Sequence, residues 1–341
     1  AIAAAFPALL PDVSAFIRQV RITVMPAARS WPQGRKDVLE AVYRIIYGGR
    51  AALEEALIQN SSDAVPPLTL IEDASGSGPS VVINGVRVHS GDIVLSRGGA
   101  PTSALIARGN DFPGNFSHAA LVHVDSDSGR AVAVESLIER GAVVSSLEDY
   151  LEEKRLRILL LRLRPDHPVV GDDPLAIHRA ATDMLHLVRN GGIGYDFSMN
   201  WEDPGRFFCS EVPYHAYRSL GIDLWAHRSR ISSPGLAEWL GGMGVRHFTT
   251  IIPSDIEYDP RLAAVAEWRN PETLRQDRFD NVVIDALLAG AEEGDRLDYP
   301  FYRLPLARLI KGWSYLQWKA GVEPLIPEGM TPGAALRVNA L

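Results

Sequence analysis

Apolar residues recur at helical spacing through the first sixty residues of the chain. Val13, Phe16, Ile17 and Val20 form one stripe, and residues 38–46 contain a second that stops at Gly48-Gly49. A third helical piece follows over residues 51–58. Stripes of this kind usually face a core, so we predict a structural helical hairpin. A surface that recruits a membrane or a partner is the alternative.

The pattern changes after a loop over residues 59–80 that is rich in Asn, Ser, Pro and Gly. Short apolar segments on either side of Asn84-Gly85 give the strongest short-range signal for a β-hairpin. A turn over residues 125–129 joins two further strands, which are almost entirely apolar, so we expect both faces of their sheet to be covered. The predicted strands are 81–83, 86–88, 91–95, 117–124, 131–137, 158–163 and 245–252.

Helical spacing returns in the second half of the chain. Residues 175–188 predict an amphipathic helix, capped by Asp172 or Asp173 and ended by Gly191-Gly192. Leu262, Val265 and Trp268 form another helical stripe, and residues 282–288 a further one. From about Pro324 the chain is rich in Pro and Gly, and we expect it to wrap over the surface. The expected organisation is a helical extension (1–75), a central α+β domain (76–255) and a helical or irregular C-terminal extension (256–341).

Composition excludes several classes of protein. The chain has 34 Lys and Arg against 42 Asp and Glu, a net charge of −8, without the basic clusters that nucleic-acid binding requires. Its single cysteine excludes an intramolecular disulfide and any multi-cysteine metal centre. No apolar run reaches the roughly eighteen residues that span a bilayer. The apolar start Ala1–Phe6 fits a processed export signal, so we expect a periplasmic or secreted location and leave the cytoplasm open.

The only cysteine, Cys209, precedes a segment with helical spacing that ends at Gly221. Pro213 is compatible with a helix only near its first turn, so the helix must begin close to Cys209. Free backbone N–H groups and the positive end of the helix stabilise a thiolate there. We expect Glu211 to favour the helix start electrostatically. An inert, buried cysteine is the alternative.

A histidine and a glutamate lie on the two strands around the turn at residues 125–129. In a hairpin the numbers of opposed residues add to a constant, here about 253 to 255. A sum of 253 makes His118 and Glu135 direct neighbours, and 255 makes them diagonal neighbours on one face, still within reach. A sum of 254 places them on opposite faces. A carboxylate at the end of an apolar run is expensive unless paired, which favours contact.

A cysteine, an imidazole and a carboxylate together can activate the thiol as a nucleophile. The imidazole is a base for the thiol near neutral pH, and the carboxylate fixes its tautomer and orientation. Backbone N–H groups at the helix start can hold an oxyanion.

The remaining polar candidates have structural interpretations. We expect His123 to be structural or exposed, since it faces away from His118, and no metal site at His178 and His186, which lack an HExxH pattern. Asp92 should serve strand-end hydrogen bonds, and Asp255 and Glu257 should be solvated loop charges.

Five short motifs occur in a characteristic order: Gly91-Asp92-Ile93-Val94, residues 116–122 with His118, Val134-Glu135, Tyr195-Asp196-Phe197, and Phe208-Cys209-Ser210-Glu211-Val212. This order resembles the circularly permuted branch of the NlpC/P60 superfamily, the YiiX/YebB-like papain-fold cysteine hydrolases, in which the histidine strand precedes the cysteine helix. The resemblance covers roughly residues 80–255.

The resemblance implies a small antiparallel β-sheet packed on the cysteine helix, an α+β fold with helical extensions at both ends. It implies Cys209 as nucleophile, His118 as base and Glu135 as the orienting residue, with Tyr195, Ser117 and Ser210 as substrate-binding residues and no cofactor or metal. The expected substrate is a cell-wall peptide or lipid-linked amide (or ester). Acyl transfer of the lecithin retinol acyltransferase-like type and a non-catalytic binding module are the alternatives. The oligomeric state is left open.

Overall fold

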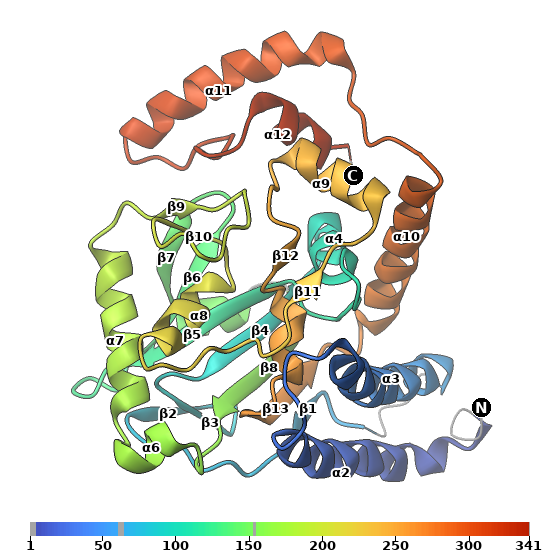
Figure 1. Ribbon diagram of the computed structural model, residues 1–341, viewed down its shortest axis with the longest axis vertical. Helices are drawn as coiled ribbons and strands as arrows, with labels where there is room; N and C mark the ends of the chain where they lie inside the picture. Colours follow the sequence, from blue (N-terminus) through green and yellow to red (C-terminus); the bar gives the residue numbers. More distant parts are fainter. Residues whose placement is uncertain (1–4, 61–64, 153–154, 341) are drawn as a thin grey trace.

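A seven-stranded antiparallel sheet forms the centre of the computed structural model, which describes residues 5–60, 65–152 and 155–340 (Figure 1). The first four residues and residues 61–64, where the helical start and the first loop are predicted, lie outside the described residues. In spatial order the strands are β1 (Leu68–Leu70), β13 (Leu262–Arg269), β8 (Arg155–Leu163), β4 (Ile93–Gly98), β5 (His118–Val124), β6 (Ala131–Leu137) and β7 (Gly141–Ser146).

Three two-stranded ribbons accompany this sheet. The predicted hairpin at Asn84-Gly85 is confirmed, and both residues have the positive φ of the favoured hairpin turn (50° and 80°). Only Thr249–Thr250 of the strand predicted over 245–252 is extended. The ribbons pair β2 (Ser80–Ile83) with β3 (Val86–His89), β9 (Gly194–Tyr195) with β10 (Arg206–Phe207), and β11 (Ser229–Arg230) with β12 (Thr249–Thr250).

Helices surround the sheet. The α-helices are α2 (Leu10–Ala28), α3 (Lys36–Asn60), α4 (Pro101–Arg108), α5 (Leu147–Glu152), α6 (Pro168–Asp172), α7 (Ala176–Arg189), α8 (Glu211–Arg218), α9 (Pro234–Met243), α10 (Leu274–Glu292), α11 (Leu304–Lys319) and α12 (Pro332–Val338). The 3-10 helices are η1 (Pro7–Leu9), η2 (Pro253–Tyr258) and η3 (Phe301–Arg303). No helix among the described residues is long and apolar enough to cross a bilayer.

The two N-terminal helices, α2 and α3, pack on each other as the predicted hairpin. The predicted end at Gly48-Gly49 is wrong, because α3 continues through both glycines to Asn60. A side chain at Gly49 would come within 3.3 Å of Ile17 on α2. The glycine therefore allows close helix packing here instead of ending a helix.

Both faces of the sheet are covered, as the apolar strands predict. Leu121 and Val134 point into a core shared with α7 and α8, where they join Val212 and Tyr217. The alternate residue Val122 points to the opposite core, with α5 and the β2–β3 ribbon. The cysteine helix α8 thus lies against β5 and β6, the strands that carry His118 and Glu135.

The prediction of a helical stripe after residue 260 is wrong. Leu262, Val265 and Trp268 lie in strand β13 instead of a helix. A short apolar run covered on both sides cannot be told from a buried helix by its spacing alone. Strands β1 and β13 come from the two predicted extensions, yet both belong to the central sheet. The three-region division itself stays a prediction.

Asp255 and Glu257 are buried in η2, so the expectation of solvated loop charges is also wrong. Glu257 accepts hydrogen bonds from Arg21 of α2 (2.6 Å) and from Arg50 of α3 (Nη1, 2.8 Å). Asp255 accepts from the Ser229 hydroxyl (3.0 Å), and burial raises the pKa of Asp255 to about 8. The Glu257 cluster joins the N-terminal helices to the core by buried charges.

Candidate active site

The start of α8 positions Cys209. The helix begins at Glu211 with Ser210 as its N-cap residue, and Pro213 lies in the first turn, as predicted. Cys209 is therefore next to the positive end of the helix, where a thiolate is stabilised. The side chain is 5% exposed, and its sulfur lies 4.0 Å from the backbone oxygen of Ser117, on the segment that leads into β5.

The register of β5 and β6 brings His118 to Glu135. Leu121 pairs with Val134, so opposed residue numbers add to 255, which makes His118 and Glu135 diagonal neighbours. Nε2 of His118 lies 2.7 Å from Oε2 of Glu135. The hydroxyl of Ser145 on β7 donates to the other Glu135 oxygen at 2.8 Å. Because Nε2 is used by the carboxylate, Nδ1 of the ring is left for Cys209.

Burial and mutual contact act in opposite directions on these groups. Burial lowers the pKa of His118, but its hydrogen bonds to Cys209 and Glu135 outweigh burial and raise it to about 9. Burial raises the pKa of the Cys209 thiol, but the hydrogen bond and positive charge of His118 outweigh burial and lower it. Burial also opposes ionisation of Glu135, yet contact with His118 holds its pKa below the ordinary value. Contact among the three groups therefore shifts the balance towards the thiolate–imidazolium–carboxylate form.

The sequence matches one family model over residues 87–266, which is 180 of the 341 residues. The model describes a permuted papain-like amidase enzyme, the YaeF/YiiX, C92 family. The chain belongs to this family. The predicted permuted papain-like family and the predicted enzyme class, a cysteine peptidase or amidase, are confirmed. Membership of the wider NlpC/P60 superfamily stays a prediction.

A crystal structure of YiiX from Escherichia coli O157:H7, described as a metalloprotein, is similar to this permuted papain-like amidase. The two share 19% identity over 53% of this chain and 98% of that chain, with a TM-score of 0.41. A search of curated proteins found no significant match. Within residues 5–60, 65–152 and 155–340 of the amidase, no three His, Cys, Asp or Glu side chains are grouped to hold a metal ion.

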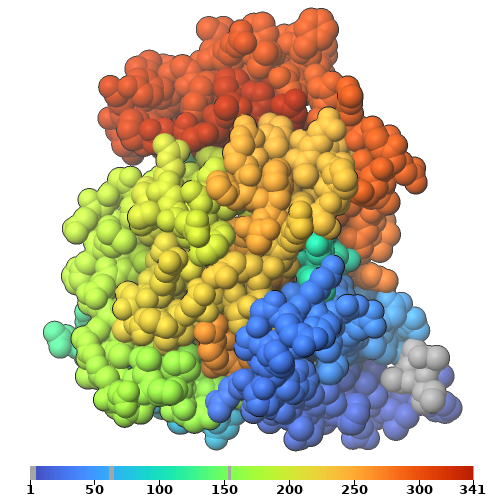
Figure 2. Space-filling model, in the orientation of Figure 1, coloured from blue at the N-terminus to red at the C-terminus, as the bar shows by residue number. Residues whose placement is uncertain are grey.

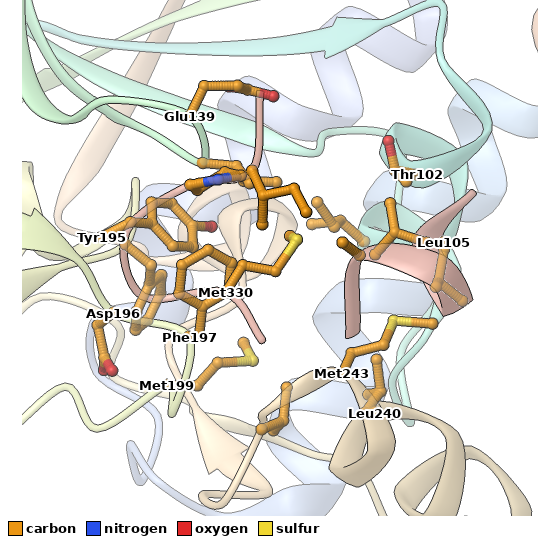
Figure 3. A pocket seen from close by; sticks show the side chains of 18 of the residues that line it. Thr102, Leu105, Glu139, Tyr195, Asp196, Phe197, Met199, Leu240, Met243 and Met330 are labelled. Atoms are coloured by element: carbon orange, nitrogen blue, oxygen red, sulfur yellow. The ribbon is translucent and has the colours of Figure 1, made fainter. Parts of the chain in front are cut away.

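A cavity of about 550 Å³ is lined in part by Cys209 of the amidase. Figure 3 shows the cavity from close by, with Tyr195, Phe197 and Met330 among its labelled side chains. Its walls come from α4, from the loop before Cys209, from α9 and from the C-terminal residues 307–339. Glu139 and Asp196 are the acidic residues of a lining that is otherwise mostly apolar. The apolar side chains include Leu105, Ile106, Phe197, Met199, Leu240, Met243, Ile252, Ile310, Ile326, Met330 and Val338.

The three predicted substrate-binding residues differ in position. Tyr195 lines the cavity, while Ser117 and Ser210, the chain neighbours of His118 and Cys209, are absent from the lining. Ser210 is completely buried, and Ser117 is 4% exposed. Substrate binding by all three stays a prediction.

Asp196 organises the loop that follows Tyr195. Its carboxylate accepts hydrogen bonds from the backbone N–H and the hydroxyl of Ser198 (2.8 and 2.6 Å) and from the N–H of Asn200 (2.5 Å). These bonds turn the chain so that Phe197 and Met199 also reach the cavity.

Glu211 does not act as the charged helix start that we expected. It is completely buried, and one carboxyl oxygen accepts a hydrogen bond from the backbone N–H of Phe208 at 2.5 Å. Burial, reinforced by the negative charges of Asp196 and Cys209, raises the pKa of Glu211 to about 10. The group is therefore neutral at pH 7 and adds no second negative charge beside the thiolate.

Several contributors to the site went unrecognised in the sequence. Ser145 steadies Glu135 from β7, and the Tyr150 ring lies 6.1 Å from the His118 ring between centroids. In the β6–β7 pairing Glu135 lies opposite Val143, so Ser145 is its diagonal neighbour on the same face. The alternation of strand faces is therefore the sequence signal for Ser145 as a partner of Glu135. The cavity wall from residues 307–339 carries no recognisable motif.

The other histidines lie outside this site. His123 is buried on the opposite face of β5, 3.1 Å from the Thr182 hydroxyl, and its ring stacks on His178. Burial and the neighbouring His178 lower the pKa of His123 to about 4. This agrees with the structural role predicted for His123.

Proposed function

We propose that this permuted papain-like amidase hydrolyses amides whose acyl part is a long apolar chain, through an acyl-enzyme on Cys209. The observation that carries the substrate class is the cavity beside the sulfur. A volume of about 550 Å³ is in the range of small-molecule sites. Its mostly apolar lining favours a lipid-linked amide over a cell-wall peptide, whose polar groups would lose hydrogen bonds to water there.

In the first half of the proposed reaction, the Cys209 thiolate attacks the amide carbonyl carbon and forms a carbon–sulfur bond. The negative charge moves to the carbonyl oxygen, for which the N–H groups of Cys209 and Ser210 at the start of α8 are the proposed donors. The His118 imidazolium then gives its proton to the leaving nitrogen. The carbon–nitrogen bond breaks, the amine departs, and a thioester remains on Cys209.

In the second half, neutral His118 takes a proton from a water molecule, which attacks the thioester carbonyl. The carbon–sulfur bond breaks, the carboxylic acid leaves, and the thiolate–imidazolium pair is restored. Glu135 keeps the imidazole in one tautomer throughout and stabilises its charged form. In this proposal Cys209 and His118 are catalytic and Glu135 is a positioning residue.

The test is a series of N-acyl para-nitroanilides whose acyl chains lengthen from acetyl to dodecanoyl. A buried methylene contributes about 0.8 kcal/mol, so kcat/KM should rise by up to about fourfold per methylene. Rates that do not depend on chain length would overturn the substrate class. Cys209→Ala should abolish turnover and keep the native melting temperature, and full activity in that variant would end the mechanism.

A cavity variant makes this test specific. Ala335 lines the cavity and is 8% exposed, so Ala335→Trp should fill part of it and slow the dodecanoyl amide far more than the acetyl amide. Ala289→Trp, at an exposed position on α10, is the matched control. Equal losses for both chain lengths would contradict an acyl chain in the cavity. Product analysis with added amine or alcohol separates hydrolysis from acyl transfer.

A further inference from the structure

A concentration of exposed apolar side chains lies in the C-terminal segment 301–325, beyond the part of the chain that matches the family model. Among the described residues, 22 large apolar side chains are exposed, and ten of them lie in this segment. Phe301 and Leu309 are 83% and 73% exposed. The space-filling view shows this part of the chain as one end of the molecule (Figure 2). The ten are Phe301, Tyr302, Leu306, Leu309, Trp313, Tyr315, Leu316, Trp318, Val322 and Leu325.

Helix α11, at the centre of this segment, has an inner face that is already occupied. Ala307 and Ile310 line the active-site cavity. Further along the same face, the Ser314 hydroxyl accepts a hydrogen bond from the N–H of Ile326 (2.9 Å), and the Gln317 side chain accepts one from Leu325 (3.3 Å). These contacts recur at i, i+3, i+7 and i+10, so they fix the rotation of the helix about its axis.

The outer face of α11 repeats the same spacing with large apolar residues. Leu306, Leu309, Trp313 and Leu316 are each at least 57% exposed. Each stands one position before a residue of the inner face, so the four form a stripe turned about 100° from it. A helix with one face on the protein and a continuous apolar stripe in water resembles those that lie in a membrane interface.

The basic residues of the segment indicate which kind of partner covers the apolar stripe. Residues 301–325 contain four basic residues and one acidic residue, Glu323, although the whole chain has a net charge of −8. Lys311 is held by the backbone oxygen of Glu328 (2.8 Å), while Arg303, Arg308 and Lys319 are exposed. A second copy of the chain in a two-fold dimer would bring the same basic face against itself. An anionic lipid surface complements the charges and accepts the apolar and aromatic side chains.

We propose that the outer face of α11, with the aromatic pair of η3, docks this protein on a bilayer that contains anionic lipids. The helix lies in the plane of the headgroups with Leu309 and Trp313 in the acyl boundary. Its inner face forms part of the wall of the Cys209 cavity, so docking brings the cavity close to the lipid surface. Docking is independent of catalysis and should be retained when Cys209 is replaced.

The test is flotation of the full chain, carrying Cys209→Ala, with two kinds of vesicle. One is pure phosphatidylcholine, and the other is one part phosphatidylglycerol to two parts phosphatidylcholine. We expect binding to the anionic vesicles at low salt and much weaker binding to the neutral ones. The double variant Leu309→Glu, Trp313→Glu should lower the partition coefficient by at least about tenfold. Arg308→Ala with Lys319→Ala should also lower it by about tenfold or more, and only for the anionic vesicles.

The matched control replaces two equally exposed aromatic residues elsewhere, Phe16→Glu with Phe279→Glu, at 68% and 67% exposure. This control should bind as the parent does, and all variants should keep the parent melting temperature. No binding to either vesicle, equal binding to both, or equal loss in the control would overturn the proposal. Self-association that Leu309→Glu, Trp313→Glu abolishes, without vesicle binding, would also overturn it and assign the face to a second copy.

Discussion

Replacing Glu135 with Gln tests how the thiol is activated. The change removes the negative charge 2.7 Å from Nε2 of His118 and keeps an oxygen that can accept its proton. A hydrogen bond to a charged partner contributes about 1.5–3 kcal/mol. At about 1.4 kcal/mol for each pKa step, the pKa of His118 should fall from about 9 to about 7 or 8.

The same free energy separates the thiolate–imidazolium pair from the neutral thiol–imidazole pair. Their ratio should therefore fall by a factor of about 10 to 150. The assay is the rate at which iodoacetamide alkylates Cys209 at pH 8, followed by intact-protein mass. We expect Glu135→Gln to slow alkylation by at most this factor, because the rate follows the fraction of thiolate and not the ratio itself. Glu148→Gln, an exposed change at the start of α5, should have no effect. An unchanged rate in a folded Glu135→Gln protein would refute the reasoning.

Other variants test the buried carboxyl groups. Glu211→Gln should keep the alkylation rate and turnover within about twofold, because the group is already neutral and Gln still accepts from Phe208. A marked drop in the pKa of Cys209 in this variant would reveal an ionised Glu211 in the native protein. Glu257→Ala should lower the free energy of unfolding in urea by about 3–5 kcal/mol, because it leaves Arg21 and Arg50 buried without their shared partner. A loss below about 1 kcal/mol would show that water reaches these charges.

The local patterns of the chain predicted the parts of the site that lie on regular elements. Pro213 placed the start of α8, and Asn84-Gly85 placed a hairpin, because each residue type restricts the backbone in one way. Hairpin arithmetic limited His118 and Glu135 to two productive registers and one unproductive one. The sum of 255 in the structure is one of the productive two. The sequence could not choose among the three registers, because it does not determine which residues form the turn.

Long-range burial could not be predicted in the same way. Glu211 and Glu257 look alike as sequence letters, but one is neutral beside a thiolate and the other is ionised between two arginines. Which state a carboxyl adopts depends on partners more than two hundred residues away in the case of Glu257. Strand β13 was misassigned because a fully buried strand loses the alternation that identifies strands.

The cavity also could not be predicted from local sequence patterns. Its wall consists of α4, the loop after Tyr195 and the C-terminal residues 307–339. None of these segments has a sequence pattern that predicts a binding site. Their apolar residues read as ordinary core or surface positions. Helix α12 packs on α9 and α11, and all three helices contribute side chains to the lining.

The most direct test of the central claim is the pH dependence of Cys209 alkylation in the native protein, which reports a single site because the chain has one cysteine. We predict a half-maximal rate well below the ordinary thiol pKa of about 8.5, and loss of this low-pH reactivity in His118→Ala. A midpoint at or above the ordinary value, unchanged in His118→Ala, would contradict an activated Cys209–His118 pair.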